Sequence, residues 1–67
     1  MEIGKKLKNA RIKAGFTQEK AAEEIDVSRQ TISNWENEKS YPDIISVIAL
    51  SDLYSVSLDE LLKGDQK

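Results

Sequence analysis

The chain has 67 residues, enough for a single domain, and it contains no Cys and no His. Disulfides, thiolate or imidazole metal sites and His-based catalysis are therefore excluded. No apolar run approaches the ~20 residues that a membrane span requires, and the N-terminus lacks the apolar segment of a signal peptide, so we expect a cytoplasmic protein. The net charge of -2 at pH 7 argues against a nucleic-acid binder that acts through bulk positive charge.

Charge is unevenly distributed along the chain. Cations dominate the N-terminal segment, where Glu2 is opposed by Lys5, Lys6, Lys8, Arg11 and Lys13. After Lys39 the acidic residues outnumber the cations. The first segment is therefore either one basic face or an ordinary solvated helix surface, and charge alone does not decide between these interpretations.

Apolar residues recur every three to four positions almost throughout, which predicts a series of short helices. The first helix is expected at about Glu2–Ala14, where Gly15 stops it. Thr17 is the candidate N-cap of a second helix at about Gln18–Ile25.

A tight turn follows the second predicted helix. Asp26 stands where a residue with positive φ is needed, and Asp tolerates this conformation better than most residues. Ser28 is the candidate N-cap of a third helix at about Arg29–Asn37. The next residues, 38–42, are expected to form a loop because Pro42 disfavours helix at the residue before it.

Two more helices complete the prediction. Asp43 is the candidate N-cap of a fourth helix at about Ile44–Tyr54. Ser57 and Glu60 form a capping box for a fifth at about Leu58–Lys63. Gly64 should end that helix, and residues 65–67 are expected to fray. The prediction is one all-α domain of five helices over residues 1–67.

The segment between Gln18 and Asn37 has the side chains that a steeply crossed helix pair requires. Ala22 is small enough for the two backbones to approach. Val27 and Ile32 are expected to fill the corner between the helices, and Trp35 to anchor the third helix to the core.

This segment resembles the Cro and lambda-repressor family of helix-turn-helix proteins, often called the XRE family. The matching residues are TQEKAAEEIDVSRQTISNWENEKSYP from Thr17 onward, followed by PDIISVIALSDLYSVSLDELLKG. The resemblance implies a lambda-repressor-like DNA-binding domain without enzymatic activity or cofactor. Asp26 and Glu38 stand where the family often has Gly, so Asn37 is expected to take the left-handed conformation instead of its neighbour.

In such folds the third helix lies in the major groove and its N-terminal residues reach the base edges. The resemblance assigns base reading to four polar residues: Arg29, Gln30, Ser33 and Asn34. Arg can bond bidentately to guanine, and Gln or Asn to adenine. Thr31 is open to two interpretations, a thymine contact or support of the helix cap. The competing interpretation of the whole set is a solvated polar face.

Phosphate contacts are expected from the residues that flank the groove. Gln18 begins the second helix, where backbone amides and the helix dipole favour an anion, and the resemblance implies that its side chain braces Gln30. Asn37 and Lys39 lie in the loop after the third helix. Lys6 and Lys13 are further candidates on the first helix.

The resemblance also implies a partly buried ion pair between Arg11 and Glu36. Its role would be to orient the third helix. The alternative is that Arg11 binds a phosphate, and one side chain could do both.

The fourth helix has more apolar positions than one inward stripe requires. Either it is buried twice, once in its own fold and once by a partner, or it is a fully buried central helix. Family members pair as symmetric dimers through this region, which suggests Tyr54, Val56 and Leu58 as interface residues.

The sequence therefore predicts a homodimeric, sequence-specific regulator of transcription, more specifically a repressor that occupies a palindromic operator in double-stranded DNA. Two alternatives remain. One is an antitoxin-type regulator that also binds a partner protein, and the other is the DNA-binding domain of a longer regulator. The sequence does not indicate a small-molecule effector.

Overall fold

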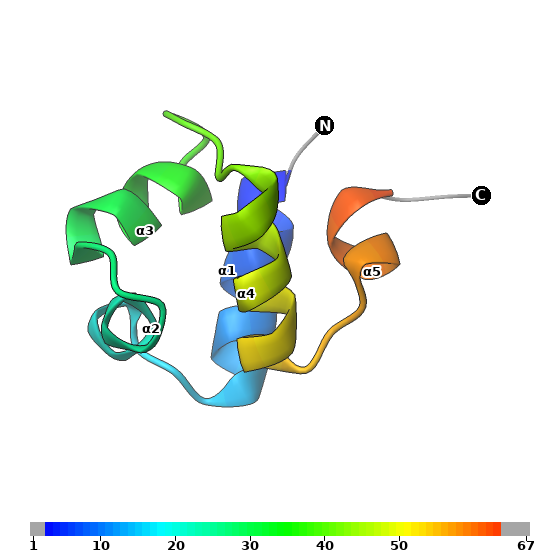
Figure 1. Cartoon of the computed structure of the whole chain (residues 1–67), viewed down its shortest axis with the longest axis horizontal. Coiled ribbons are helices and arrows are strands. Elements are labelled where there is room, and N and C mark those ends of the chain that lie inside the picture. Colours follow the sequence, from blue (N-terminus) through cyan, green and yellow to red (C-terminus); the bar gives the residue numbers. More distant parts are fainter. Residues whose placement is uncertain (1–2, 64–67) are drawn as a thin grey trace.

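The computed structural model describes residues 3–63. Five helices follow one another along the chain (Figure 1): α1 Ile3–Ala14, α2 Gln18–Glu24, α3 Arg29–Glu36, α4 Ile44–Tyr54 and α5 Leu58–Leu62. No strand occurs within residues 3–63. The prediction of an all-α fold with five helices is confirmed, whereas Glu2, Gly64 and the predicted frayed tail lie outside the described residues.

Four of the five helices begin where the polar pattern predicts. Side-chain oxygens of the residues before α2, α3, α4 and α5 each accept a hydrogen bond from a backbone N–H of the first turn. These N-cap residues are Thr17, Ser28, Asp43 and Ser57. At α5 the Glu60 carboxylate also accepts from the Ser57 N–H at 3.0 Å, which completes the predicted capping box. The helix ends differ from the prediction by one residue at α2, α3 and α5, as fraying ends commonly do.

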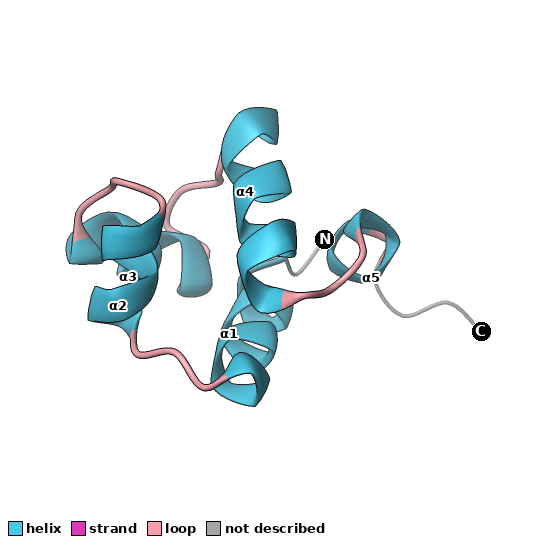
Figure 2. Cartoon of the chain, turned by 60° about the horizontal axis from the view of Figure 1, so that its bottom comes forward, coloured by secondary structure: helices cyan, strands magenta, loops and turns pink. Residues whose placement is uncertain are grey.

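The helices pack around α1. This helix contacts α3, α4 and α5, while α2 packs on α3. In Figures 1 and 2, α2 and α3 lie on one side of the α1–α4 pair and α5 lies on the other. The largest of the fully buried side chains come from four different helices: Leu7, Ile32, Leu50 and Leu61. Burying apolar surface from every layer in one cluster holds so small a domain together.

Gly4 allows α1 to approach the C-terminal end of α3 closely. A Cβ atom at this position would lie 2.6 Å from the Trp35 carbonyl oxygen and 2.7 Å from that of Glu36. The Gly4 N–H also donates to Glu38 Oε2 at 2.7 Å. The contact therefore fixes the first turn of α1 against both α3 and the loop after it.

Within residues 3–63, three residues other than glycine have positive φ, and each lies in a turn. Asp26 has φ 62°, as predicted. The prediction for Asn37 is wrong, because Asn37 has φ -98° and the left-handed residue is Glu38, with φ 62°. Asn37 instead caps α3 through its own N–H. Glu38 is left-handed because the chain closes the end of α3 locally: the Lys39 N–H donates to the Asn34 carbonyl oxygen at 2.9 Å, and the Glu38 N–H donates to that of Trp35 at 3.3 Å. Ser55, at φ 58°, ends α4 in the same way and was not predicted.

α4 is not a fully buried helix. Val47, Leu50 and Tyr54 point into the core, but Ile44, Ile45 and Ile48 are exposed. The interpretation of α4 as a fully buried central helix is therefore wrong, and burial of its outward face by a partner stays a prediction.

Candidate nucleic-acid interface

The α2–α3 pair is held by small and apolar side chains on its inner side. Ala21 and Ala22 are buried where α2 meets α3, and their size lets the two backbones approach. Val27 in the turn packs against the core, and its N–H donates to the Ala22 carbonyl at 2.9 Å. These contacts hold the short connection between the helices and set the direction in which α3 leaves α2.

α3 has one buried face and one polar face. Ile32 and Trp35 are buried in the core. Arg29 and Gln30 are exposed, and Ser33 and Asn34 are half-buried. The four residues predicted to read bases thus lie on the part of α3 that the core leaves accessible.

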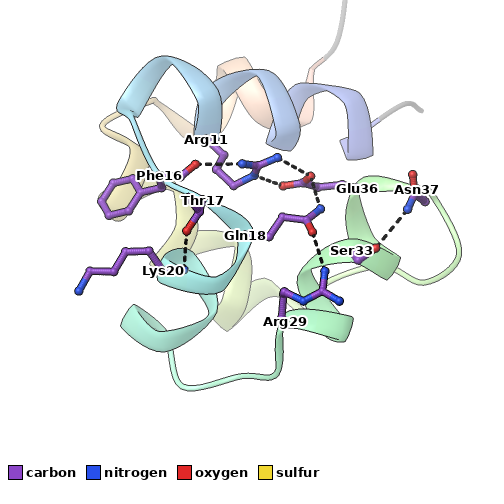
Figure 3. Close-up of polar contacts among 9 residues, drawn as sticks. All are labelled: Arg11, Phe16, Thr17, Gln18, Lys20, Arg29, Ser33, Glu36 and Asn37. Atoms are coloured by element: carbon purple, nitrogen blue, oxygen red, sulfur yellow. Dashed lines mark hydrogen bonds and ion pairs between the residues drawn. The ribbon is translucent and has the colours of Figure 1, made fainter.

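A chain of hydrogen bonds connects the core to the start of α3 (Figure 3). Arg11 Nε donates to Glu36 Oε2 at 2.7 Å and Arg11 Nη2 to Glu36 Oε1 at 3.1 Å. Gln18 Nε2 donates to Glu36 Oε1 at 3.0 Å. Arg29 Nη1 then donates to Gln18 Oε1 at 3.2 Å. Arg29 is therefore coupled to the buried ion pair through a single amide.

The ion pair itself is a bidentate contact between α1 and α3. The hydrogen bond and charge of Glu36 raise the pKa of Arg11 despite its partial desolvation. Arg11 Nη1 also donates to the Phe16 carbonyl at 2.9 Å, so the guanidinium is engaged on three sides. This geometry is that of an orienting residue rather than of a side chain extended towards a phosphate.

Two more side-chain hydrogen bonds hold polar residues along α3. Gln30 Nε2 donates to Asn34 Oδ1 at 3.0 Å, one helical turn away. Asn37 Nδ2 donates to Ser33 Oγ at 3.3 Å. Gln30 keeps its carbonyl oxygen and a second N–H, which match the N6 donor and N7 acceptor of adenine. The pairing holds this amide in place without using up its recognition atoms.

The loop after α3 folds back onto the helix. The N–H groups of Lys39 and Ser40 both point to the Asn34 carbonyl oxygen, at 2.9 and 3.4 Å. Asn37 and Lys39 are exposed in this loop, beside the C-terminal end of α3. Both side chains can therefore reach a ligand that lies along the polar face.

Comparison with known proteins identifies this arrangement. A family model described as helix-turn-helix matches residues 7–61, and its matched region includes α2, the turn and α3. The chain belongs to the helix-turn-helix family of Cro and lambda-repressor type. The HTH-type transcriptional regulator ImmR of Bacillus subtilis (strain 168) is 46% identical over 66 residues, which are 98% of this chain and 52% of ImmR. The HTH-type transcriptional activator BcrR of Enterococcus faecalis is 44% identical over 66 residues, which are 98% of this chain and 32% of BcrR.

A solved structure shows the same fold. The P22 c2 repressor protein, crystallised in complex with synthetic operator 9T in the presence of Tl+, superposes with a TM-score of 0.87 at 32% identity. The match covers 97% of this chain and 98% of that chain. By contrast, the chain spans about half the length of ImmR and about a third of BcrR. The chain is a helix-turn-helix DNA-binding domain of the kind found in transcriptional regulators.

One contact of the helix-turn-helix differs from the expectation. Gln18 was predicted to brace Gln30, but its side chain contacts Arg29. The reason is position on the helix: Arg29 is the first residue of α3 and lies beside the start of α2, whereas Gln30 points towards Asn34. Because both ends of the Gln18 amide are occupied, a phosphate would be met by its backbone N–H at the start of α2.

The lysines of α1 divide between two sides of the helix. Lys6 and Lys13 line a surface depression with Val56 and Glu60, on the side of α5. Lys5 and Lys8 line a different depression, together with Glu36, Asn37 and Glu38 at the end of α3. The structure therefore brings Lys5 and Lys8, rather than Lys6 and Lys13, next to Asn37. The three-residue spacing of Lys5 and Lys8 was a signal that they share a face, but the sequence did not show which face α3 covers.

The predicted dimer residues lie mostly inside the domain. Tyr54 is only 4% exposed, and its ring lies 6.0 Å from that of Phe16, centroid to centroid. Val56 and Leu58 are partly buried and pack against the core. Tyr54 therefore offers little surface to a second molecule, and the role of Val56 and Leu58 stays a prediction.

Other kinds of site are not evident in the part of the chain that the structure describes. Within residues 3–63 no group of acidic side chains is arranged to hold a metal ion. None of the described helices is long and apolar enough to cross a membrane.

Proposed function

We propose that this helix-turn-helix binds double-stranded DNA by placing α3 in the major groove, where Arg29, Gln30, Ser33 and Asn34 read base edges. The observation that carries the proposal is the pair of opposite faces of α3. Ile32 and Trp35 fix the helix to the core, while its polar side chains face outward in prearranged positions. The likeness to a repressor solved on operator DNA supports it.

Phosphate contacts position the domain in this proposal. The strands that border the groove are contacted by the backbone amide of Gln18, by the side chains of Asn37 and Lys39, and by the two lysines of α1 beside Asn37, Lys5 and Lys8. Such contacts supply affinity and register but carry no direct sequence information. Base contacts therefore have to provide most of the discrimination between sequences.

The regulatory mode we propose is repression by a homodimer on a palindromic operator. Repression requires only that the protein occupy DNA that polymerase needs, and a DNA-binding domain is sufficient for that. Two-fold symmetry places two copies of α3 in successive major grooves, about 34 Å apart.

The decisive experiment is selection of bound sites from a random duplex pool at a fixed salt concentration. We expect enrichment of an inverted repeat with half-sites about one helical turn apart. A pool that shows no enrichment would refute sequence-specific binding. Enrichment of a single unrepeated half-site would refute the symmetric dimer while leaving base reading intact.

Two substitutions separate reading from positioning. Gln30→Ala should lose about 1–3 kcal/mol of discrimination at one base pair of each half-site. Lys39→Ala should weaken binding to all sequences alike. It should also lower the slope of log affinity against log salt concentration by about 1 per protomer. Asp59→Ala, at an exposed position of α5, is the control and should change neither quantity.

A further inference from the structure

Glu38, in the loop directly after α3, has two features that do not stabilise the fold. Its φ is 62°, a conformation that glycine adopts without strain and that other residues rarely adopt. Its Oε1 atom is buried and accepts no hydrogen bond from the described part of the chain, which costs free energy. A glycine at this position would remove both costs. Local stability therefore does not explain why a glutamate stands here.

The second carboxylate oxygen of Glu38 forms a contact with a distant part of the chain. Oε2 accepts from the Gly4 N–H at 2.7 Å, across 34 positions. Gly4 lies in the first turn of α1, where a backbone N–H has no acceptor within the helix and the helix dipole favours a negative charge. The carboxylate is thus held against the start of α1, although its neighbours in the chain, Asn37 and Lys39, are exposed. This contact keeps the acidic group of the loop away from an anion that the loop would bind.

The same contact connects the loop to α1. Hydrogen bonds join residues 37–40 to α3, through the Asn34 carbonyl oxygen and, from Asn37, through the Ser33 hydroxyl (Figure 3). These bonds fix the loop to the helix before it and do not reach α1. Within residues 3–63, the Glu38 contact is the only hydrogen bond between this loop and α1.

The Glu38 contact brings together phosphate-binding groups from both elements. Lys5 and Lys8 of α1 line one surface depression with Asn37 and Glu38. Lys39 is exposed in the same loop. Four side chains that can donate to phosphate oxygens therefore lie on two elements, and their spacing depends on how the loop is fixed to α1. They are called the phosphate-contact set below: Lys5, Lys8, Asn37 and Lys39.

We propose that Glu38 is a positioning residue for the DNA backbone. By bonding to α1 it aligns the two lysines of the phosphate-contact set with the two loop members along one DNA strand, and it does not touch DNA itself. The proposal deepens the proposed function and rests on it. A loop that is already in place loses less conformational freedom on binding. Because phosphate contacts carry no direct sequence information, the affinity gained is the same for every base sequence.

Two uncharged variants test this role. Glu38→Gln and Glu38→Gly remove the same charge, so both relieve the repulsion of DNA equally. The Gln amide oxygen can still accept from the Gly4 N–H, whereas Gly cannot accept but adopts positive φ freely. On the duplex selected from the random pool, Glu38→Gln should bind at least as tightly as the native chain.

Glu38→Gly should bind about tenfold more weakly than Glu38→Gln on every sequence, because the phosphate-contact set is no longer aligned. Its slope of log affinity against log salt concentration should be lower by about 1 per protomer. Equal affinities of the two variants would overturn the inference. A loss confined to one base pair would also overturn it, since Glu38 would then act on base reading.

Asp26 provides a matched control. Its φ is also 62°, and its acidic side chain is exposed in the turn before α3. Asp26→Asn and Asp26→Gly should bind DNA equally, because neither variant breaks a contact with α1. If glycine weakened binding at both positions to the same extent, loosening of the backbone would explain the result and the role of Glu38 would be refuted.

Hydrogen exchange of the free protein tests the contact without DNA. The Gly4 N–H should exchange about tenfold more slowly in the native chain and in Glu38→Gln than in Glu38→Gly. Glu38→Asn is one methylene shorter than Glu38→Gln and tolerates positive φ, so it should behave like Glu38→Gly in exchange and in binding, and it replaces that variant if glycine prevents folding. Fast exchange of the Gly4 N–H in the native chain would overturn the inference.

Failure of the inference is distinguishable from failure of the proposed function. If the native chain binds no duplex, the proposed function fails, and the positioning role fails with it. If the native chain binds DNA and Glu38→Gln and Glu38→Gly bind equally, only the role of Glu38 is refuted.

Discussion

The carboxylate of Glu36 accepts hydrogen bonds from three nitrogen atoms, two on Arg11 and one on Gln18. Its side chain is only 3% exposed, so water cannot replace these donors. A buried carboxylate without a cation carries a large desolvation cost. The ion pair therefore holds α3 against α1. Through Gln18 it also positions the guanidinium of Arg29.

Replacing Arg11 with Met should lower the free energy of unfolding by about 3–5 kcal/mol, because Glu36 would remain buried without its partner. Urea denaturation followed by circular dichroism measures this. The matched control is Lys20→Met, which removes exposed contacts of 3.5 Å to Glu23 and Glu24 and should cost at most about 1 kcal/mol. If Arg11→Met does not fold, Arg11→Met/Glu36→Leu should recover much of the loss. Similar losses for Arg11→Met and Lys20→Met would contradict the buried role.

Tyr54 is the other residue whose environment predicts a measurable shift. Burial, followed by the negative charge of Glu36, raises the pKa of Tyr54 from 10.0 to about 12. The folded-state pKa lies above the unfolded value, so the contribution to stability is complete below pH 10 and is lost as the pH rises through about 12. A spectroscopic titration of tyrosinate in the Tyr41→Phe variant isolates Tyr54. A midpoint near 10 in the folded protein would refute the effect of burial.

At the scale of the elements, the polar N-cap residues in the sequence were sufficient to place the starts of four helices. Thr17, Ser28, Asp43 and Ser57 each cap a helix because their side chains satisfy N–H groups of the next residues, which is a local interaction. Contacts between elements could not be predicted from the sequence in the same way. The hydrogen bond from the Gly4 N–H to the Glu38 carboxylate, for example, joins residues 34 positions apart in the chain.

The candidate site also has features that the sequence predicted and features that it did not. The reading face of α3 follows from helical periodicity and from the resemblance to known helix-turn-helix sequences. The partner of Gln18 did not follow, because neighbouring residues Arg29 and Gln30 differ only in the direction in which α3 presents them. The outward face of α4 was one of two open interpretations, since periodicity shows that a helix has two apolar faces but not whether the fold covers both.

The close approach of α1 to α3 makes an unusual prediction for Gly4. In an ordinary helix, Gly→Ala stabilises by up to about 1 kcal/mol. Here the new Cβ would lie 2.6 Å from a backbone oxygen of Trp35, so Gly4→Ala should destabilise the domain by about 1–3 kcal/mol. Thermal denaturation should show a lower Tm for this variant. Asn9→Ala, on the exposed side of α1, should raise it slightly. A Gly4→Ala variant more stable than the native protein would refute the close packing.

For the whole molecule, the distribution of charge matters more than its sum. The net charge is -2, yet Lys5 and Lys8 lie around the end of α3, and Lys39 is exposed in the loop that follows. The acidic residues Asp52, Asp59 and Glu60 belong to α4 and α5. Three exposed lysines can thus lie beside α3 even though the chain as a whole is acidic.

This distribution predicts which lysines of α1 contribute to DNA binding. Each cation that neutralises a phosphate adds about 0.9 to the slope of log affinity against log salt concentration. Lys5→Gln/Lys8→Gln removes two cations beside Asn37 and should lower the slope by about 2 per protomer on a fixed operator. Lys6→Gln/Lys13→Gln removes the same charge on the side of α5 and should change the slope little. The two double variants have equal net charge, so a difference between them reports position alone. Equal slopes for both would indicate that the overall field of the molecule governs binding. A larger effect from Lys6 and Lys13 would place the DNA strand on the other side of α1.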